Sequence, residues 1–113
     1  MSEALVIGGS GFLGQHLVRM LVDRGHSIRV LGRRAAGSGV AAGVRCFKCE
    51  VADARLVSEA VKGADLVYDL ASNNSGTWEE FQRTYVEGTR NAANACMEHG
   101  VGRFIYASTI EAA

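Results

Sequence analysis

Four glycines separate a short apolar run from an amphipathic stretch near the start of the chain. The segment reads VIGGSGFLGQHL, residues 6–17, with glycines at positions 8, 9, 11 and 14. Residues 3–8 form a nearly continuous apolar run, as expected of a strand in a parallel sheet with both faces covered. Residues 11–25 repeat apolar side chains with helical spacing and end on Gly25, a residue that favours helix termination. The glycines therefore mark a sharp strand-to-helix turn, which also suits a backbone that a ligand approaches closely.

The rest of the chain alternates strands with helices. Further strands are predicted at 26–32, 44–51, 64–71 and 102–108, and helices at 54–63 and 78–99. Asp53 is expected to cap the helix at 54–63. The long helix is expected to bury a stripe with spacings of three and four: Trp78, Phe81, Tyr85, Thr89, Ala92 and Cys96. This alternation predicts βαβ units with right-handed crossovers. The expected fold is therefore one α/β domain over residues 1–113. It is a Rossmann-type doubly wound parallel sheet of about five strands in the order 3-2-1-4-5.

Composition favours a packed soluble domain and gives no sign of a polyanionic partner. The 113 residues are 48% hydrophobic, and 12 basic side chains balance 12 acidic ones. A neutral chain has no electrostatic drive toward nucleic acid or an anionic membrane. The start of the chain lacks the basic and apolar regions of a signal peptide, and no apolar run is long enough to span a membrane. We therefore expect a cytoplasmic protein that binds neither nucleic acid nor membrane.

Cys46 and Cys49 spell a C-x-x-C pattern, but its context argues against redox or metal chemistry. The pattern lies within the predicted strand at 44–51, where residues three apart point to opposite faces. A redox pair normally begins a helix. A zinc site needs four ligands, whereas the chain adds only Cys96 and three scattered histidines. No metal site is predicted.

The glycine spacing and two later segments resemble one enzyme family. Glycines 8, 11 and 14 follow G-x-x-G-x-x-G, and DLVYDLAS resembles a strand motif of the form D-x-V-x-H-x-A-A. YVEGTRNAANACMEHGVGRFIYAST resembles N-V-x-G-T-x-N followed by G-V-x-R-F-V-Y-x-S-S. Together these segments resemble the extended short-chain dehydrogenase/reductases, which include epimerases, dehydratases and 3β-hydroxysteroid-dehydrogenase-like enzymes. The match runs from Leu5 to about Glu111, and it implies a nicotinamide dinucleotide cofactor and a small-molecule substrate.

The resemblance implies cofactor contacts along the ends of the strands. Gly8 would permit the sharp exit from the strand, Gly11 the approach of the pyrophosphate, and Gly14 close packing of the helix. Glu50 would take the place of the aspartate that binds the adenine amine, with Val51 packing on the ring. NAD-selective members carry an acidic residue after the second strand, where this chain has arginines that suit a 2′-phosphate, so NADP is favoured over NAD. The full set implied to contact the dinucleotide is Gly8, Gly11, Phe12, Leu13, Gly14, Arg33, Arg34, Glu50, Val51, Leu70, Ala71 and Ser72.

The resemblance implies only some of the residues that catalysis in this family needs. Thr109 aligns with the family's Ser/Thr that hydrogen-bonds the substrate oxygen, and Ser108 precedes it. The family's general acid/base motif, Tyr-x-x-x-Lys, does not occur in the sequence, and Asp69 and Tyr85 stand where the family has His and Asn. We therefore expect the N-terminal, cofactor-binding part of a longer oxidoreductase or epimerase/dehydratase. The alternatives are a module that senses NAD(P) without catalysis and a scaffold without ligand, and the substrate and homodimer formation stay open.

Overall fold

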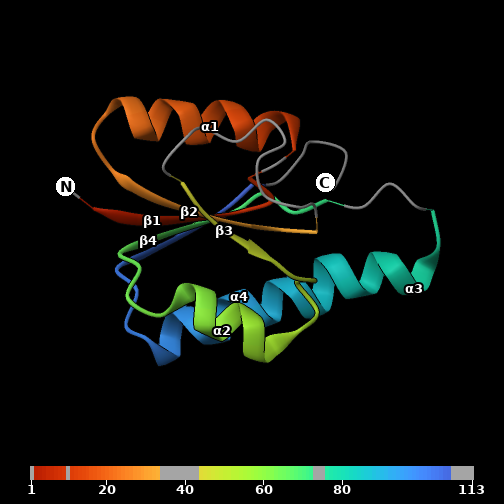
Figure 1. Ribbon diagram of the computed structural model, residues 1–113. Helices are drawn as coiled ribbons and strands as arrows, with labels where there is room; N and C mark the ends of the chain where they lie inside the picture. Colours follow the sequence, from red (N-terminus) through yellow and green to blue (C-terminus); the bar gives the residue numbers. More distant parts are fainter. Residues whose placement is uncertain (1, 10, 34–43, 73–75, 108–113) are drawn as a thin grey trace.

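The protein folds around a five-stranded parallel sheet with helices on both faces (Figure 1). The computed structural model describes residues 2–9, 11–33, 44–72 and 76–107. Within them the strands are β1 (Glu3–Ile7), β2 (Ser27–Gly32), β3 (Arg45–Lys48), β4 (Leu66–Asp69) and β5 (Arg103–Tyr106). The helices are α1 (Phe12–Asp23), α2 (Ala54–Val61), α3 (Trp78–Phe81), the π-helical η1 (Gln82–Glu87) and α4 (Gly88–Glu98).

The strand order is β3-β2-β1-β4-β5, and every neighbouring pair is parallel. This confirms the predicted Rossmann-type sheet in the order 3-2-1-4-5. The end of β1 lies between the ends of its neighbours, because Ile7 pairs with Leu31 on β2 and with Asp69 on β4. The strand order reverses between β1 and β4, and in such sheets ligands bind outside the carboxyl ends of the strands at this reversal.

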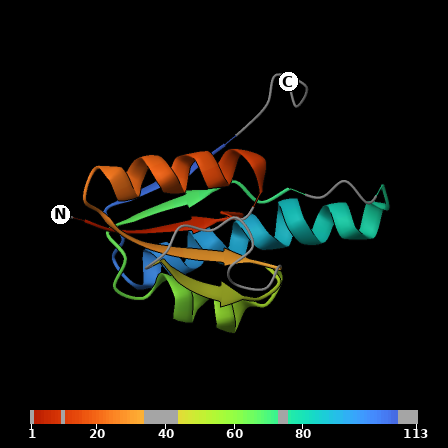
Figure 2. The same cartoon turned by 45° about the horizontal axis from the view of Figure 1, so that its top comes forward.

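Two apolar layers hold the sheet between α1 on one face and α2 with α4 on the other (Figure 1, Figure 2). On β1, Val6 faces the α1 layer and Ile7 the opposite layer, and both are fully buried. Burial of each such side chain stabilises the fold by about 2 kcal/mol. Cys46 packs in the α1 layer and Cys49 in the opposite one, so the two sulfurs diverge as predicted.

The predicted long helix is continuous, but it is neither regular nor buried along its whole length. The expected apolar stripe is buried only in α4, whose buried residues are Gly88, Ala92, Ala95 and Cys96. The side chains of Trp78 and Phe81 are instead exposed, at 68% and 47%. One reason is that α3 projects beyond the sheet (Figure 2). The other is η1, where the Gly88 N–H bonds to the carbonyl of Arg83, five residues back, and the wider turn shifts the phase of the side chains before it.

A buried arginine, which the sequence analysis did not single out, ties α2 to the sheet. Arg29 on β2 is only 8% exposed, and its Nε donates to Glu3 Oε1 at 2.9 Å. Its Nη1 donates to the carbonyl oxygens of Ala60 at 2.8 Å and Lys62 at 2.6 Å. These carbonyls lie at the negative end of α2, so the arginine is compensated by a carboxylate and by the helix dipole together. The C-terminal end of α2 is thereby fixed against β1 and β2.

Candidate functional site

Packing inside the fold requires three of the four glycines in the turn after β1. Gly8 has a φ of +83°, and a Cβ built on it would lie 2.9 Å from the Ala71 nitrogen. A Cβ on Gly9 would lie 2.8 Å from the Val30 side chain. A Cβ on Gly14 would overlap the Gly8 carbonyl oxygen, so α1 packs directly on the turn that precedes it. The overlaps at Gly8 and Gly14 are with backbone atoms and that at Gly9 is with a branched side chain, so none of the three positions has room for a larger residue.

Gly11 is the exception within this turn. Among the described residues, a Cβ on Gly11 would have a single neighbour within 4 Å, the Gly8 carbonyl oxygen at 3.4 Å. Its φ of −76° and ψ of 177° are accessible to any residue. Gly11 is the N-cap of α1, so no N-cap side chain accepts from the N–H groups of the first turn, which also holds no acidic residue. The bare backbone therefore leaves the positive end of the helix open to an anionic ligand.

Phe12 and Leu13 form the first turn of α1, directly behind Gly11. Their side chains are 84% and 58% exposed, and the Phe12 ring packs edge-on against His16 with 4.9 Å between ring centroids. Both residues carry first-turn N–H groups that have no intrahelical partner. The structure thus places the predicted contact residues Gly11, Phe12 and Leu13 together at the open end of the helix.

The exit from β4 lies against the glycine turn. The Leu70 N–H donates to the last carbonyl oxygen of β1 at 2.8 Å, and Ala71 lies against Gly8. Asp69 is buried, and its Oδ1 accepts from the Ala71 N–H at 3.2 Å. Burial raises the pKa of the Asp69 carboxyl above its usual range, and the bond from the Ala71 N–H opposes this shift to a smaller extent. Leu70, Ala71 and the exposed Ser72 therefore border the same reversal point as the glycine turn.

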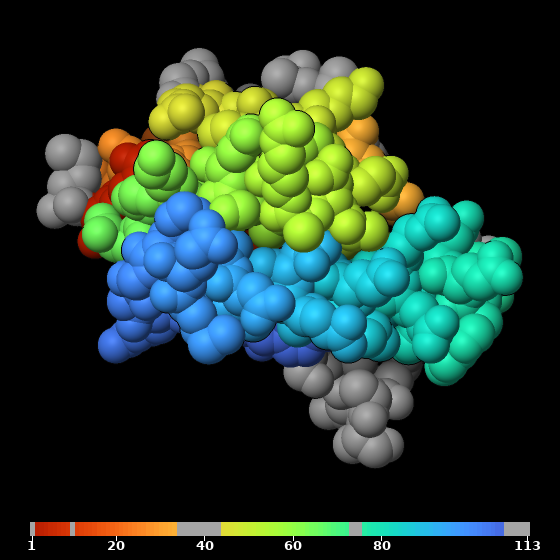
Figure 3. Space-filling model, turned by 90° about the horizontal axis from the view of Figure 1, so that it is seen from below, coloured from red at the N-terminus to blue at the C-terminus, as the bar shows by residue number. Residues whose placement is uncertain are grey.

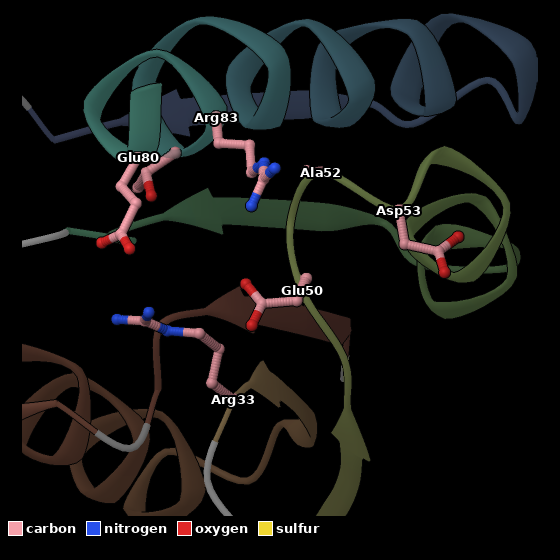
Figure 4. Close-up of a pocket in the computed structure, with 7 residues that line it drawn as sticks. Arg33, Glu50, Ala52, Asp53, Glu80 and Arg83 are labelled. Atoms are coloured by element: carbon pink, nitrogen blue, oxygen red, sulfur yellow. The ribbon is translucent and has the colours of Figure 1, made fainter. Parts of the chain in front are cut away.

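A cavity of about 450 Å³ opens beside the ends of β2 and β3 (Figure 4). Arg33 follows β2, Glu50 follows β3, and Arg83 projects from η1 on the other side. The residues that line it are Arg33, Glu50, Ala52, Asp53, Glu80, Arg83 and Thr84. Two residues predicted to contact the cofactor, Arg33 and Glu50, thus meet in one cavity. Its guanidinium and carboxylate groups offer hydrogen-bond donors as well as acceptors.

Val51 belongs to the core layer beside this cavity. Its Cγ2 would lie 2.5 Å from a Cβ built on Gly88, so the valine packs directly on the α4 backbone. The Asn91 Nδ2 donates to the Val51 carbonyl oxygen at 2.9 Å. Helix α4 therefore holds the loop after β3 in place, and a contact of Val51 with an adenine ring stays a prediction.

The cavity wall that η1 and α3 supply was not predicted from the sequence. Glu80, Arg83 and Thr84 are spaced by three and four, which places them on one side of a helix. This polar spacing was available in the sequence. The apolar stripe through Trp78 and Phe81 predicts a different buried face for the same helix, and this prediction is wrong for residues before α4.

Three predicted site residues, Arg34, Ser108 and Thr109, lie outside the described residues. The Ala107 N–H donates to the Asp69 carbonyl oxygen at 3.1 Å, so the described chain leaves β5 beside the end of β4. This is the carboxyl edge of the sheet, where the sequence analysis expects Ser108 and Thr109 to act. The roles of these three residues stay predictions.

Ser58 of α2 contacts Glu98 and His99 at the C-terminal end of α4. Figure 3 shows the two helices side by side. The Ser58 hydroxyl lies 3.1 Å from Glu98 Oε1 and 2.9 Å from His99 Nε2. The same Nε2 lies 3.2 Å from Glu98 Oε1. A hydrolytic triad needs the hydroxyl and the carboxylate on different ring nitrogens. This cluster therefore links two helices and is not arranged for nucleophilic catalysis.

Residues 2–9, 11–33, 44–72 and 76–107 contain no group of three or more His, Cys, Asp or Glu side chains suited to a metal ion. The same residues also contain no helix with the length and hydrophobicity that a membrane crossing requires.

Residues 5–113 match the model of the 3-beta hydroxysteroid dehydrogenase/isomerase family. One relative is the 2-alkyl-3-oxoalkanoate reductase of Stenotrophomonas maltophilia, 38% identical over 95% of this chain and 33% of the relative. A second is the 3-beta-hydroxysteroid dehydrogenase of Mycolicibacterium neoaurum, 32% identical over 96% of this chain and 32% of the relative. The chain spans about a third of the length of these curated relatives.

Solved structures show the same architecture. The enzyme WbmG of Bordetella bronchiseptica, in complex with NAD, is 29% identical, with a TM-score of 0.84. The match covers 93% of this chain and 36% of WbmG. The fold similarity and the family match agree with the motifs that suggested extended short-chain dehydrogenase/reductases. The chain belongs to the 3-beta hydroxysteroid dehydrogenase/isomerase family.

Proposed function

We propose that the chain binds a nicotinamide dinucleotide, with the pyrophosphate over Gly11 and the first turn of α1. The observation that carries this proposal is the contrast inside the glycine turn. Gly8, Gly9 and Gly14 are required by packing, whereas Gly11 is not and leaves an uncapped helix N-terminus at the strand-order reversal. A diphosphate supplies the negative charge and the acceptor oxygens that this position lacks. The NAD complex of WbmG supports the same ligand class.

The adenosine end of the dinucleotide would occupy the cavity beside β2 and β3. Glu50 would accept from the adenine amine, and Arg33 would face the 2′-phosphate of NADP. We favour NADP over NAD because guanidinium groups follow β2 where a carboxylate would repel that phosphate. Leu70, Ala71 and Ser72 would border the ribose and nicotinamide side.

We further propose that this chain is the cofactor-binding part of an oxidoreductase or epimerase/dehydratase that acts on a small-molecule substrate. When bound, the dinucleotide would supply hydride transfer at a carbonyl or alcohol carbon. The residues of this chain bind and orient it, and Thr109 would hydrogen-bond the substrate oxygen. The general acid/base would come from a Tyr-x-x-x-Lys outside these 113 residues, because none occurs within them.

A module that senses NAD(P) without catalysis is the second candidate. Asp69 favours it, because this buried carboxylate stands at the position of the family's usual His and bonds the Ala71 N–H. The native reading frame distinguishes the two candidates. Continuation of that frame into a Tyr-x-x-x-Lys supports the enzyme, whereas a frame that ends without this motif supports the sensing module.

Calorimetric titration of the chain with NADPH and NADH tests the binding proposal directly. The informative variant is Gly11→Ala, because its methyl group fits the fold and occupies the space proposed for the pyrophosphate. Gly102→Ala is the matched control, since a Cβ there would likewise meet one backbone oxygen at 3.4 Å, that of Asp65. We expect Gly11→Ala to weaken both nucleotides at least about tenfold, equivalent to about 1.4 kcal/mol. Gly102→Ala should bind like the parent chain.

The same titration tests the NADP preference. We expect the parent chain to bind NADPH more tightly than NADH and Arg33→Asp to abolish that difference, because the new carboxylate repels the 2′-phosphate. Circular dichroism confirms that each variant is folded. A folded parent chain that binds neither nucleotide would refute the proposed function, whereas tighter binding of NADH would refute only the preference for NADP.

A further inference from the structure

The helix that follows β4 turns a polar side toward the cavity. Its π-helical segment η1 accommodates one residue more than an α-helical turn, and one residue corresponds to about 100° around the helix axis. Residues within and before η1 are therefore rotated relative to the buried face of α4. Glu80, Arg83 and Thr84 line the cavity, while Trp78 and Phe81 are exposed.

Two guanidinium groups approach the cavity from opposite sides. Figure 4 shows Arg83 reaching in from η1, Arg33 from the end of β2, and Glu50 between them. Within the described part of the chain, neither arginine takes part in an ion pair. Glu50 lies beyond ion-pair distance of both arginines, so each guanidinium keeps N–H donors from which a phosphate can accept. The arrangement therefore suits a ligand that carries a phosphate group.

The carboxylates of the cavity suit the rest of the same ligand. Asp53 is already engaged, since its Oδ1 accepts from the Leu56 N–H at 3.2 Å and caps α2. Glu50 and Glu80 remain as acceptors, and a purine base offers an amine as donor. The cavity therefore offers carboxylate acceptors for an adenine amine and guanidinium donors for a phosphate. Together these groups match an adenosine that bears an additional phosphate ester.

We propose that Arg83 is a specificity-determining residue that binds the 2′-phosphate of NADPH together with Arg33. This inference rests on the proposed nucleotide-binding function and extends it to a helix about fifty residues further along the chain. A phosphate held by two guanidinium groups accepts charge-assisted hydrogen bonds from both sides. NADH lacks this phosphate and therefore gains nothing from Arg83.

The test compares NADPH and NADH binding by calorimetry in Arg83→Gln, at two salt concentrations. We expect NADPH to bind about tenfold more weakly and NADH to change by less than about twofold. The salt dependence of NADPH binding should also decrease, because one charge contact is lost. Arg90→Gln is the control, since Arg90 is exposed on α4 outside the cavity, and it should change neither affinity. Arg83→Lys keeps the charge without the planar fork and should recover part of the NADPH affinity.

Two results would overturn the assignment of Arg83. The first is equal weakening of both nucleotides, which would mean that Arg83 serves the shared part of the ligand or the fold. The second is no change in either affinity. Both results leave the NADPH-to-NADH affinity ratio of Arg83→Gln equal to that of the parent chain, whichever nucleotide the parent chain prefers. The proposed function fails differently, because in that case the folded parent chain binds neither nucleotide and Gly11→Ala has no effect. Thermal unfolding of each variant separates lost contacts from lost structure.

Discussion

The N-termini of α1 and α2 occupy equivalent places in the fold, but only that of α2 is capped by a side chain. Each helix follows a strand at the carboxyl edge of the sheet, α1 after β1 and α2 after β3. At α2 the N-cap Asp53 accepts from the Leu56 N–H at 3.2 Å. At α1 the N-cap is Gly11, which has no side chain to accept anything. The fold can therefore cap a helix with its own carboxylate, and α1 lacks such a cap where a ligand is proposed.

The largest effect on stability is expected from a methyl group at Gly14, on the helix side of the glycine turn. Gly14→Ala places a Cβ on the Gly8 carbonyl oxygen and close to Gly9 Cα, and neither backbone atom can move without opening the turn. We expect a loss of at least about 4 kcal/mol in the free energy of unfolding, enough to unfold many domains. Urea denaturation followed by circular dichroism measures the change. A loss below about 1 kcal/mol would show that the turn is loosely packed and that Gly11 is not exceptional.

The next prediction transfers the cap of α2 to α1. Gly11→Asp provides a carboxylate for the first-turn N–H groups and should stabilise the fold by a few tenths of a kcal/mol. The same carboxylate removes the N–H donors proposed for the pyrophosphate and repels it. We therefore expect NADPH to bind at least about a hundredfold more weakly, by calorimetry, although the protein is slightly more stable.

Gly11→Asn separates the two effects of that substitution. Asparagine caps a helix about as well as aspartate but carries no charge, so its effect on nucleotide affinity should be smaller than that of Gly11→Asp. The proposal of a pyrophosphate site would be contradicted if Gly11→Asp bound NADPH as tightly as the parent chain.

A smaller effect is expected when the cap of α2 itself is removed. Asp53→Ala leaves the first-turn N–H groups of α2 without their side-chain acceptor and should cost about 1 kcal/mol of stability. Asp53→Ser, which can still cap, should recover most of this loss. Urea denaturation of the two variants checks the prediction, and equal stability of all three proteins would show that α2 does not depend on its cap.

The sequence predicted the sheet and its order but not the cavity wall opposite Arg33. Strands such as β1 were predictable because a parallel sheet buried on both faces demands a nearly continuous apolar run. The polar wall of Glu80 and Arg83 was not predicted, since η1 changes the phase of the helix and apolar periodicity assumes a regular α-helix. The role of Arg29 was equally invisible, because its partners on α2 lie about thirty residues away in the sequence.

The two carboxylates that bond backbone N–H groups near the proposed site provide the last and smallest prediction. Asp53 and Asp69 each accept one such bond at 3.2 Å, but Asp53 is exposed and Asp69 is buried. Because burial raises the pKa of Asp69 in the folded state, its ionisation opposes folding above that pKa. This cost is present at neutral pH and disappears as the pH falls through the folded and then the unfolded pKa.

Asp69→Asn keeps an oxygen that can accept from the Ala71 N–H and removes the buried charge. We therefore expect the variant to be more stable than the parent chain at pH 7, and we expect the difference to shrink as the pH is lowered. Urea denaturation at several pH values measures it. Asp53→Asn, at the exposed cap, should show no comparable gain at neutral pH. If the variant is less stable than the parent chain at every pH, the prediction is wrong. The Asp69 carboxylate would then gain more free energy from its partners than its burial costs, and the Ala71 N–H would not be the only group that holds it at the end of β4.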